Sequence, residues 1–367
     1  MKVLVTGANG FIGRNLCFQL ENEKHEVFRY DMNNTIEDLS SMVEQADFIF
    51  HLAGINRPQK VEEFYEGNSD LTKTIIELIE KRNCQIPILL SSSIQAALEN
   101  DYGKSKLQAE EYVYEYGVRN TIPCYIYRLA NVFGKWSKPN YNTVVATFCH
   151  KIVYGEPIEI SDPNKEVSFV YIDDVVSAFI SCLQLPSVND EYLEAKPVYT
   201  ITLQKLADLI YSYKESRDNF QIVRVDDAFS KKLYSTYLSF LDEKDFAYST
   251  INHVDDRGCF SELFKGESFG QVSINISKPG ITKGNHWHHT KIEKFVVVKG
   301  TGLIRFRKVD GEEIIEYPVS GDDLKIVDIP PGYTHSIVNM GLEELVTVIW
   351  TNELFDPDKP DTYYLEV

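Results

Sequence analysis

Four side chains in the last quarter of the sequence have the types and the spacing of a metal site. His286 and His288 are separated by one residue, Glu293 begins the next predicted strand, and His335 comes just after the turn Pro330–Gly332. Side chains alternate between the two faces of a strand, so we expect both of the first two histidines on one face. Three imidazoles and one carboxylate suit Zn²⁺, Fe²⁺, Mn²⁺ or Ni²⁺, and the spacing does not choose among these ions.

The other end of the sequence opens with the glycine-rich stretch TGANGFIG, residues 6–13, directly after a predicted strand. Glycines at such a junction let the backbone turn sharply and approach a pyrophosphate, which then lies against the positive end of a helix dipole. A plain strand-to-helix turn also uses glycine. The position after a first strand favours a dinucleotide-binding loop.

A third set of reactive residues lies between these two. Tyr102 and Lys106 are four residues apart, which places them on one face of a predicted helix. A nearby ammonium favours phenolate over phenol, so we expect Tyr102 to exchange protons near neutral pH. Ser91–Ser93 end the preceding predicted strand, where a hydroxyl can bind a carbonyl oxygen. Together these residues indicate proton transfer at a carbonyl group.

The elements that position these residues change character near residue 245. Before it, apolar strands alternate with amphipathic helices, which predicts an α/β fold with a Rossmann-type, doubly wound parallel sheet. The predicted strands are Lys2–Thr6, Glu26–Tyr30, Asp47–Leu52, Pro87–Ser92, Ile122–Leu129 and Glu166–Tyr171. The predicted helices include Phe11–Leu20, Leu71–Arg82, Ser105–Tyr116 and Asp174–Gln184. After residue 245, short β-branched runs and a hairpin signal at Asp310-Gly311 predict an all-β domain. We therefore expect two domains, 1–245 and 246–367.

Composition excludes several classes of partner. The 367 residues carry a formal net charge of −18, which argues against nucleic acid or an anionic membrane as partner. No apolar run approaches the roughly 18–20 residues of a membrane span. The six cysteines form no Cys-x-x-Cys pair, so we expect reduced, buried thiols in a cytoplasmic protein.

Residues 1–245 resemble the extended short-chain dehydrogenases/reductases. The resemblance rests on the glycine loop, on the Tyr102/Lys106 pair, and on the sequences HLAG (51–54) and RLANVFG (128–134). It implies that Ser93 polarises a substrate carbonyl, Tyr102 transfers the proton, and Lys106 supports Tyr102 and the nicotinamide ribose. The cofactor-binding residues expected from these motifs are Gly7, Gly10, Phe11, Ile12, Gly13, Arg14, Asp31, Leu52, Ala53, Gly54, Tyr102 and Lys106.

The choice of cofactor stays open at this point. Asp31 ends the second predicted strand, where a carboxylate binds the ribose 2′-OH of NAD(H) and repels a 2′-phosphate. Arg14 and Arg29 are near enough in sequence to bind that phosphate, and the family resemblance favours NADP(H). Sugar-nucleotide 4,6-dehydratases of the superfamily carry an acidic pair after the catalytic hydroxyl. Here Ile94-Gln95 stands there, which favours simple hydride transfer.

The histidine-rich part resembles the cupins. Both cupin motifs are present, although the interval Gly321–Pro330 is longer than usual. The resemblance implies a jelly-roll barrel that holds one divalent metal, for which zinc is our first expectation. Such a metal could act as a Lewis acid beside a ketone or could simply hold the barrel mouth in shape.

A reductase followed by a cupin is similar to the bifunctional capsular-polysaccharide enzymes that form UDP-2-acetamido-2,6-dideoxy-β-L-talose. The resemblance implies that the cupin epimerises C3 of a UDP-4-keto-6-deoxy-HexNAc and that the reductase then reduces the C4 ketone with NAD(P)H. Epimerisation must come first, because the C3 proton is acidic only while C4 is a carbonyl. We expect a UDP-sugar substrate and a homodimer. The candidate substrate-binding residues are Arg57, Arg128, Asn131 and Lys138.

Two alternatives stay open. The first is a sugar-nucleotide epimerase that retains its NAD and regenerates it in each turnover, beside a structural cupin. The second is a metal- or sugar-sensing cupin on a degenerate reductase. The intact set of Ser93, Tyr102 and Lys106 argues against degeneracy.

Overall fold

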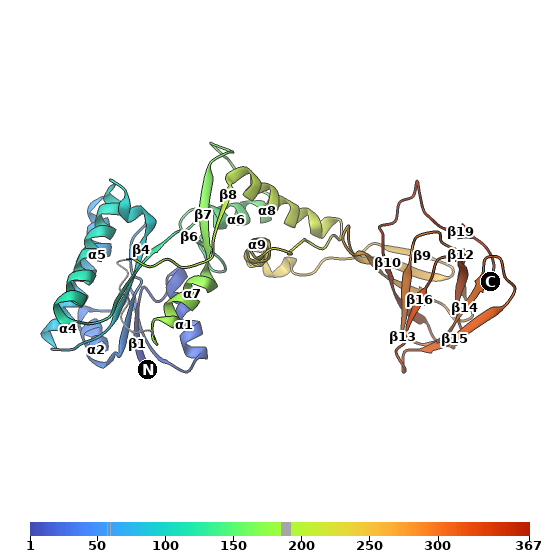
Figure 1. Ribbon diagram of the computed structural model, residues 1–367, viewed down its shortest axis with the longest axis horizontal. Helices are drawn as coiled ribbons and strands as arrows, with labels where there is room; N and C mark the ends of the chain where they lie inside the picture. Colours follow the sequence, from blue (N-terminus) through green and yellow to red (C-terminus); the bar gives the residue numbers. More distant parts are fainter. Residues whose placement is uncertain (57, 59, 185–191) are drawn as a thin grey trace. The chain divides into compact units, whose positions relative to one another are not determined.

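The computed structural model describes residues 1–56, 58, 60–184 and 192–367. These residues form two compact units, which we treat separately. Unit 1 comprises Met1–Tyr211 and Val225–Leu241, and unit 2 comprises Ser212–Arg224 and Asp242–Val367 (Figure 1). Among the described residues, no helix combines the length and the apolar character needed to cross a membrane.

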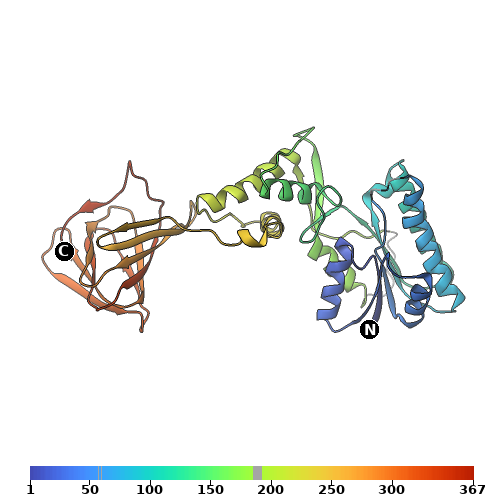
Figure 2. The same ribbon diagram turned by 180° about the vertical axis from the view of Figure 1, so that it is seen from behind.

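Unit 1 is built on a five-stranded parallel sheet of order β2-β1-β3-β4-β5. Its strands are β1 (Lys2–Thr6), β2 (Glu26–Tyr30), β3 (Phe48–His51), β4 (Ile88–Ser93) and β5 (Cys124–Leu129). One face is covered by α1 (Phe11–Asn22) and α7 (Ile172–Ser181), the other by α2 (Ile36–Gln45), α4 (Leu71–Lys81) and α5 (Asp101–Asn120). Figure 1 and the view from behind in Figure 2 both show helices on the two sides of this sheet. The predicted Rossmann-like fold is confirmed.

The continuous apolar runs of these strands follow from burial on both faces. Val3 and Val5 pack into the core beneath α1 and α7, whereas Leu4, between them, packs into the core beneath α2, α4 and α5. Because successive side chains of a strand point to opposite faces, a strand that feeds two cores must be apolar at every position.

The remaining elements of unit 1 lie beyond the parallel sheet. They are α3 (Glu62–Phe64), the π-helix η1 (Tyr65–Asp70), η2 (Ile94–Ala97), β6 (Asn131–Phe133), α6 (Val144–Val153), β7 (Glu166–Tyr171), β8 (Val198–Thr202), α8 (Leu203–Asp218), which runs on into unit 2, and α9 (Ala228–Leu238). The predicted strand at 166–171 exists with the expected bounds. It joins β6 and β8 in a separate three-stranded sheet instead of extending the parallel one, with β6 paired parallel to it and β8 antiparallel.

Unit 2 consists mainly of two antiparallel sheets. The first has the order β16-β13-β18-β11-β10-β9 and the second β15-β14-β17-β12-β19. The strands are β9 (Asn252–Asp255), β10 (Gly258–Gly266), β11 (Gly270–Ser277), β12 (Thr282–Trp287), β13 (Glu293–Lys299), β14 (Thr301–Lys308), β15 (Ile314–Ser320), β16 (Ile326–Ile329), β17 (Tyr333–Asn339), β18 (Leu345–Thr351) and β19 (Tyr363–Tyr364), preceded by the short helix η3 (Glu243–Asp245). The all-β domain and the β14–β15 hairpin around Asp310-Gly311 are confirmed. The barrel expected from sequence is not closed by strand pairing within these residues.

The segment 212–224 belongs to unit 2 although it precedes part of unit 1 in sequence. The backbone N–H of Lys265, in β10, donates to the carbonyl of Phe220 at 2.9 Å. The carbonyl of Lys265 accepts the backbone N–H of Ile222 at 2.8 Å. The domain boundary at residues 245–246 stays a prediction. A cut at that position would separate these residues from the strand that they hydrogen-bond.

A buried chain of hydrogen bonds joins β1, β3 and α4 at the carboxyl end of the parallel sheet. The Thr72 hydroxyl donates to the carbonyl of Asn68 at 2.6 Å, so it accepts from His51 Nε2 at 2.8 Å. His51 Nδ1 is then the acceptor for the Thr6 hydroxyl at 2.7 Å. Burial is the main cause that lowers the pKa of His51 to about 3, so its imidazole is neutral.

We predict that Thr6→Val destabilises unit 1, whereas Thr6→Ser has a much smaller effect. The Thr6 oxygen also accepts the backbone N–H groups of Leu52 and Ala53, each at 3.2 Å. Valine removes the hydroxyl and leaves its buried polar partners without a hydrogen bond, which lowers the free energy of unfolding by about 1–3 kcal/mol for each such group. Hydrogen-exchange mass spectrometry of residues 1–56 in the full-length protein measures the change. Equal protection in the valine and serine variants would contradict this role.

Candidate functional sites

The glycine loop forms a cradle of bare backbone at the start of α1. A Cβ added to Gly13 would lie 2.1 Å from the carbonyl oxygen of Gly7, and one added to Gly7 would lie 2.8 Å from the backbone nitrogen of Ala53. Gly7 has φ +66°, which favours glycine. The loops after β1 and β3 therefore touch where the sheet reverses its winding, which is the usual ligand position in such sheets.

The first turn of α1 suits a phosphate. Its N-cap residue Gly10 supplies no side-chain cap, and the turn holds no acidic residue. Backbone N–H groups and the positive end of the helix dipole therefore remain for an anion. The residues present thus fit the pyrophosphate of a nicotinamide dinucleotide.

The three residues that were expected to choose the cofactor have other contacts in the structure. The Asp31 carboxylate accepts the backbone N–H of Asn9, in the glycine loop, at 2.7 Å. Arg29 pairs with Glu21 at 2.7 Å, and Arg14 lies over the ring of Trp136 at 4.2 Å. Asp31 is thus held beside the glycine loop, and the choice between NADH and NADPH stays open.

Ser93, Tyr102 and Lys106 come together at the carboxyl end of β4. Asn100 caps α5 by accepting the N–H of Gly103 at 2.8 Å. The helix therefore begins at Asp101 and carries Tyr102 in its first turn. The Ser93 side chain is close enough to the Tyr102 phenol to act towards a lower pKa of that phenol. Lys106 is buried and donates from Nζ to the carbonyl of Ser91 at 3.2 Å.

The titration of this group differs from the sequence-based expectation. Burial raises the pKa of Tyr102, while the Ser93 hydrogen bond works in the opposite direction. The expected lowering by Lys106 is therefore wrong for the protein without its ligands. Burial also lowers the pKa of Lys106 to about 8. In this state Tyr102 is a protonated phenol, which is the form that can donate to a carbonyl oxygen.

Gly54, which was predicted, and Asn68, which sequence reasoning missed, lie close to Lys106. A Cβ on Gly54 would lie 2.8 Å from Lys106 Nζ and 2.7 Å from Asn68 Oδ1, so the lysine head reaches the HLAG loop. Asn68 is buried in the π-helix η1, donates to the Ser105 hydroxyl at 3.0 Å and accepts the N–H of Ile55 at 3.0 Å. A π-helix often marks a functional site. The sequence carries no signal for this one beyond the stretch of residues that precedes α4.

The candidate substrate-binding residues do not form one group in the structure. Arg57 lies outside the described residues. Arg128 forms a bidentate ion pair with the buried Glu110, with Nη2 2.6 Å from Oε2, and lies 3.4 Å over the ring of Tyr192. These contacts occupy its guanidinium fork. Asn131 donates to the carbonyl of Ser168 at 3.0 Å.

Lys138 is exposed in the loop between β6 and α6. Its backbone N–H donates to Asn142 Oδ1 at 2.6 Å, which folds the loop back on itself. Tyr141 of the same loop is close enough to Tyr102 to raise the pKa of that phenol. The loop that carries Lys138 therefore borders Tyr102.

In unit 2, His286, His288, Glu293 and His335 form one cluster. The ligand atoms of all four lie within 4.8 Å of one another. His286 on β12 pairs directly with His335 on β17, and His288 follows two residues later. Glu293 opens β13, as predicted, and comes from the other sheet. The cluster thus joins both sheets.

The cluster contains buried polar atoms that a cation would satisfy. His288 Nε2, Glu293 Oε2 and His335 Nε2 are buried and have no hydrogen-bond partner among the described residues, and Oε2 lies 3.4 and 3.2 Å from the two nitrogens. Burial lowers the pKa of His286 to about 4, so this imidazole offers a lone pair at neutral pH. Burial works to raise the pKa of Glu293, but its histidine neighbours outweigh this and hold it well below its usual range. The donor set fits a divalent metal.

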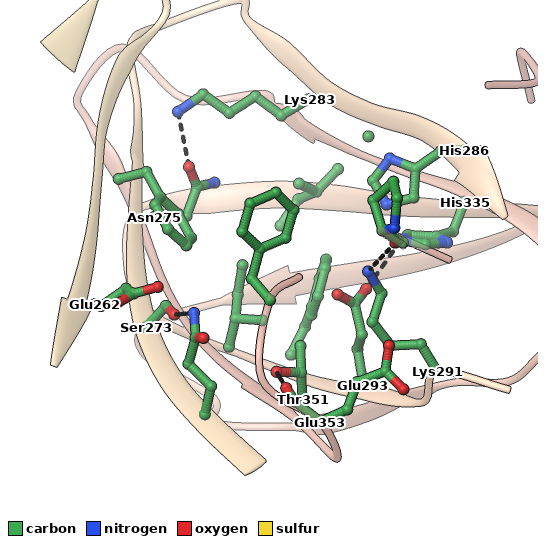
Figure 3. A pocket seen from close by; sticks show the side chains of 18 of the residues that line it. Glu262, Ser273, Asn275, Lys283, His286, Lys291, Glu293, His335, Thr351 and Glu353 are labelled. Carbon is green, nitrogen blue, oxygen red and sulfur yellow. Dashed lines mark hydrogen bonds and ion pairs between the residues drawn. The ribbon is translucent and has the colours of Figure 1, made fainter. Parts of the chain in front are cut away.

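The cluster opens onto a cavity of about 470 Å³, which His286, Glu293 and His335 help to line (Figure 3). Figure 3 shows Lys283 and Asn275 at a distance from the cluster, joined by a hydrogen bond of 2.7 Å. The walls mix apolar with polar side chains: Phe260, Phe295, Ile337 and Ile349 with Glu262, Gln271, Ser273 and Thr351. A mainly apolar lining with a few polar groups is usual for a site that binds a small molecule.

Comparison with known proteins finds relatives over both units. A sequence profile of the NAD dependent epimerase/dehydratase family matches residues 3–194. A profile of the polysaccharide biosynthesis C-terminal domain matches residues 253–363. The spore coat polysaccharide biosynthesis protein SpsL of Bacillus subtilis is 30% identical over 122 residues, which cover 30% of this chain and 80% of that protein.

Two relatives match the whole length. The chain is 45% identical over 368 residues to the UDP-2-acetamido-2,6-beta-L-arabino-hexul-4-ose reductase of Pseudomonas aeruginosa, covering 100% of this chain and 99% of that one. The crystal structure of the capsular polysaccharide assembling protein CapF from Staphylococcus aureus matches with a TM-score of 0.94 at 49% identity, covering 100% of both chains. The expected kinship with nicotinamide-dependent enzymes is confirmed, and the chain belongs to the NAD dependent epimerase/dehydratase family, extended by a polysaccharide biosynthesis C-terminal domain.

Proposed function

We propose that this protein is a bifunctional enzyme of nucleotide-sugar metabolism. In this proposal unit 2 epimerises C3 of a UDP-4-keto-6-deoxy-HexNAc, and unit 1 reduces the C4 ketone with NAD(P)H. The product is UDP-2-acetamido-2,6-dideoxy-L-talose, for the synthesis of a capsule or another polysaccharide. The full-length match to a reductase of a UDP-linked 4-ketosugar supports the substrate class.

Reduction uses the residues around β4. The reduced nicotinamide supplies the hydride that reaches C4. Tyr102, held as a protonated phenol, donates its proton to the C4 oxygen, and the nearby Ser93 hydroxyl donates a hydrogen bond to the same oxygen. The charge of Lys106, below its pKa of about 8, stabilises the phenolate that remains. One hydride and one proton convert the ketone to an alcohol.

The observation that carries the epimerase half is the opening of the metal cluster onto a cavity. Three of the four candidate ligands line its wall, so a metal held by them would face the cavity and a substrate bound there. A bound divalent metal would supply Lewis-acid stabilisation of negative charge on a substrate oxygen. The C3 proton of the ketosugar is acidic because the neighbouring carbonyl takes up that charge. Loss of this proton from one face of C3, followed by addition of a proton to the opposite face, inverts the configuration of C3.

Several finer assignments belong to the same proposal. We assign unit 2 to the cupins and its metal to zinc, and we retain a domain boundary near residues 245–246. We further propose a cytoplasmic homodimer. The two-sheet architecture and the donor set support the first two assignments. The family name also allows an epimerase that retains its nicotinamide, and the consumption of added cofactor distinguishes the two.

We predict that Tyr102→Phe lowers the rate of ketone reduction by about 10²–10⁴, because it removes the proton donor. The measurement is oxidation of added NADH or NADPH by the ketosugar, which should approach one cofactor for each sugar in the wild type. Tyr112→Phe, on the same helix, is the matched control, since its phenol accepts only from Gln108. A Tyr102→Phe enzyme within a few-fold of wild type, or a wild type that consumes no added cofactor, would overturn the reductase assignment.

We predict that Glu293→Gln binds zinc at least about tenfold more weakly and loses exchange of the C3 proton with solvent. The change removes the only carboxylate of the cluster while it keeps the size of the side chain. Metal content is measured by elemental analysis and C3 exchange by NMR in D₂O without cofactor.

Glu316→Gln is the control for this experiment. It lies in the same unit, on β15, where it pairs with Arg305 at 2.9 Å. Full zinc occupancy in Glu293→Gln would show that the metal ligands are wrongly assigned. Loss of zinc with unchanged C3 exchange would leave the metal a structural role only.

A further inference from the structure

Asp361 holds the loop that carries His288. Its backbone carbonyl accepts a hydrogen bond from His288 Nδ1 at 2.7 Å. Its carboxylate accepts the backbone N–H groups of residues 289, 290 and 291 at 3.0, 2.8 and 2.9 Å, and the hydroxyl of Thr290 at 3.1 Å. Three successive N–H groups around one carboxylate form an anion-binding turn. One residue thus fixes both the loop and the ring at its start.

The same part of the chain fixes the strand that carries His286. Asn285 is the extra residue of a bulge in β12, with φ +60°, and its backbone therefore lacks a partner on β17. Its carbonyl accepts the N–H of Leu365 at 3.0 Å, and its side chain accepts that of Val367 at 3.4 Å. Tyr363 and Tyr364 pair with the last two residues of β12. We call residues 361–367 the clamp segment.

The bond to Asp361 decides which nitrogen of His288 can act as a ligand. Because a carbonyl only accepts, the proton of the neutral ring is on Nδ1 and the lone pair is on Nε2. Nε2 is the buried atom that lies 3.4 Å from Glu293 Oε2 and has no hydrogen-bond partner. Without the carbonyl, the ring could adopt the other tautomer or rotate away from the cluster.

From these contacts we propose that Asp361 is a positioning residue of the metal centre, and that the clamp segment aims His286 and His288 at the ion. Asp361 acts through the ligands and does not itself bind the metal. The inference rests on the proposed metal centre of unit 2. Nothing in the local sequence around the two histidines indicates it, since Asp361 is 73 residues from His288.

The test compares Asp361→Ala with Asp358→Ala in the full-length protein. Both changes remove one acidic side chain from the same stretch, but the carboxylate that binds the 289–291 loop is that of Asp361. Zinc affinity is measured by competition with a chromophoric chelator, and the ligand geometry by the absorption spectrum of the Co²⁺-substituted protein. We expect Asp361→Ala to bind zinc about 10–100-fold more weakly and to have an altered Co²⁺ spectrum.

A further variant separates positioning from folding. Asp361→Asn keeps one acceptor oxygen for the loop, so its zinc affinity should lie between those of Asp361→Ala and wild type, with circular dichroism unchanged. Zinc affinity of Asp361→Ala within threefold of that of Asp358→Ala, together with an unaltered Co²⁺ spectrum, would refute the inference. If the wild-type protein binds no zinc, the proposed metal centre is wrong and the positioning role fails with it.

Discussion

A buried carboxylate among imidazoles is the constraint on which unit 2 depends. Glu293 lies at the junction of the two sheets, and its Oε2 and the Nε2 atoms of His288 and His335 have no hydrogen-bond partners. A buried polar group without a hydrogen-bond partner destabilises the folded state, and a charge removed from water destabilises it more. A divalent cation would satisfy all of these atoms at once and would tie strands of both sheets to one point. In the proposed metal centre, the bulge in β12 and the clamp segment aim these side chains at the ion.

Unit 1 meets the same constraint with hydrogen bonds. The neutral His51 lies within a chain of hydroxyl groups in which each proton has an acceptor. Lys106 is buried beside it and keeps one bond to a backbone carbonyl, and burial lowers its pKa. A buried ammonium on the same helix face as a protonated phenol is suited to chemistry that moves a proton. In the proposed function, the polar interior of unit 1 therefore serves both its folding and its reaction.

The sequence predicted those features that arise from local pattern. The bounds of β1, β2 and β7, the start of β13 at Glu293 and the β14–β15 hairpin follow from apolar periodicity and turn residues. Features that depend on contacts between distant residues were missed. Examples are the ion pair of Arg128 with Glu110, the pairing of residues 220–222 with β10, and Asp361. The raised pKa of Tyr102 was missed for a related reason, since burial is a property of the fold and not of the four-residue spacing.

The central claim is that one ketosugar loses a proton at C3 in one unit and gains a hydride at C4 in the other. Both events can be tested with the full-length protein by following deuterium from the solvent or from the cofactor into the product. The UDP-4-keto-6-deoxy-HexNAc is converted once in D₂O with unlabelled reduced cofactor and once in H₂O with cofactor deuterated at the transferred position. The account predicts deuterium at C3 in the first product and at C4 in the second, as seen by NMR. A product that keeps protium at C3 in D₂O, or that takes no deuterium from the cofactor, would contradict it.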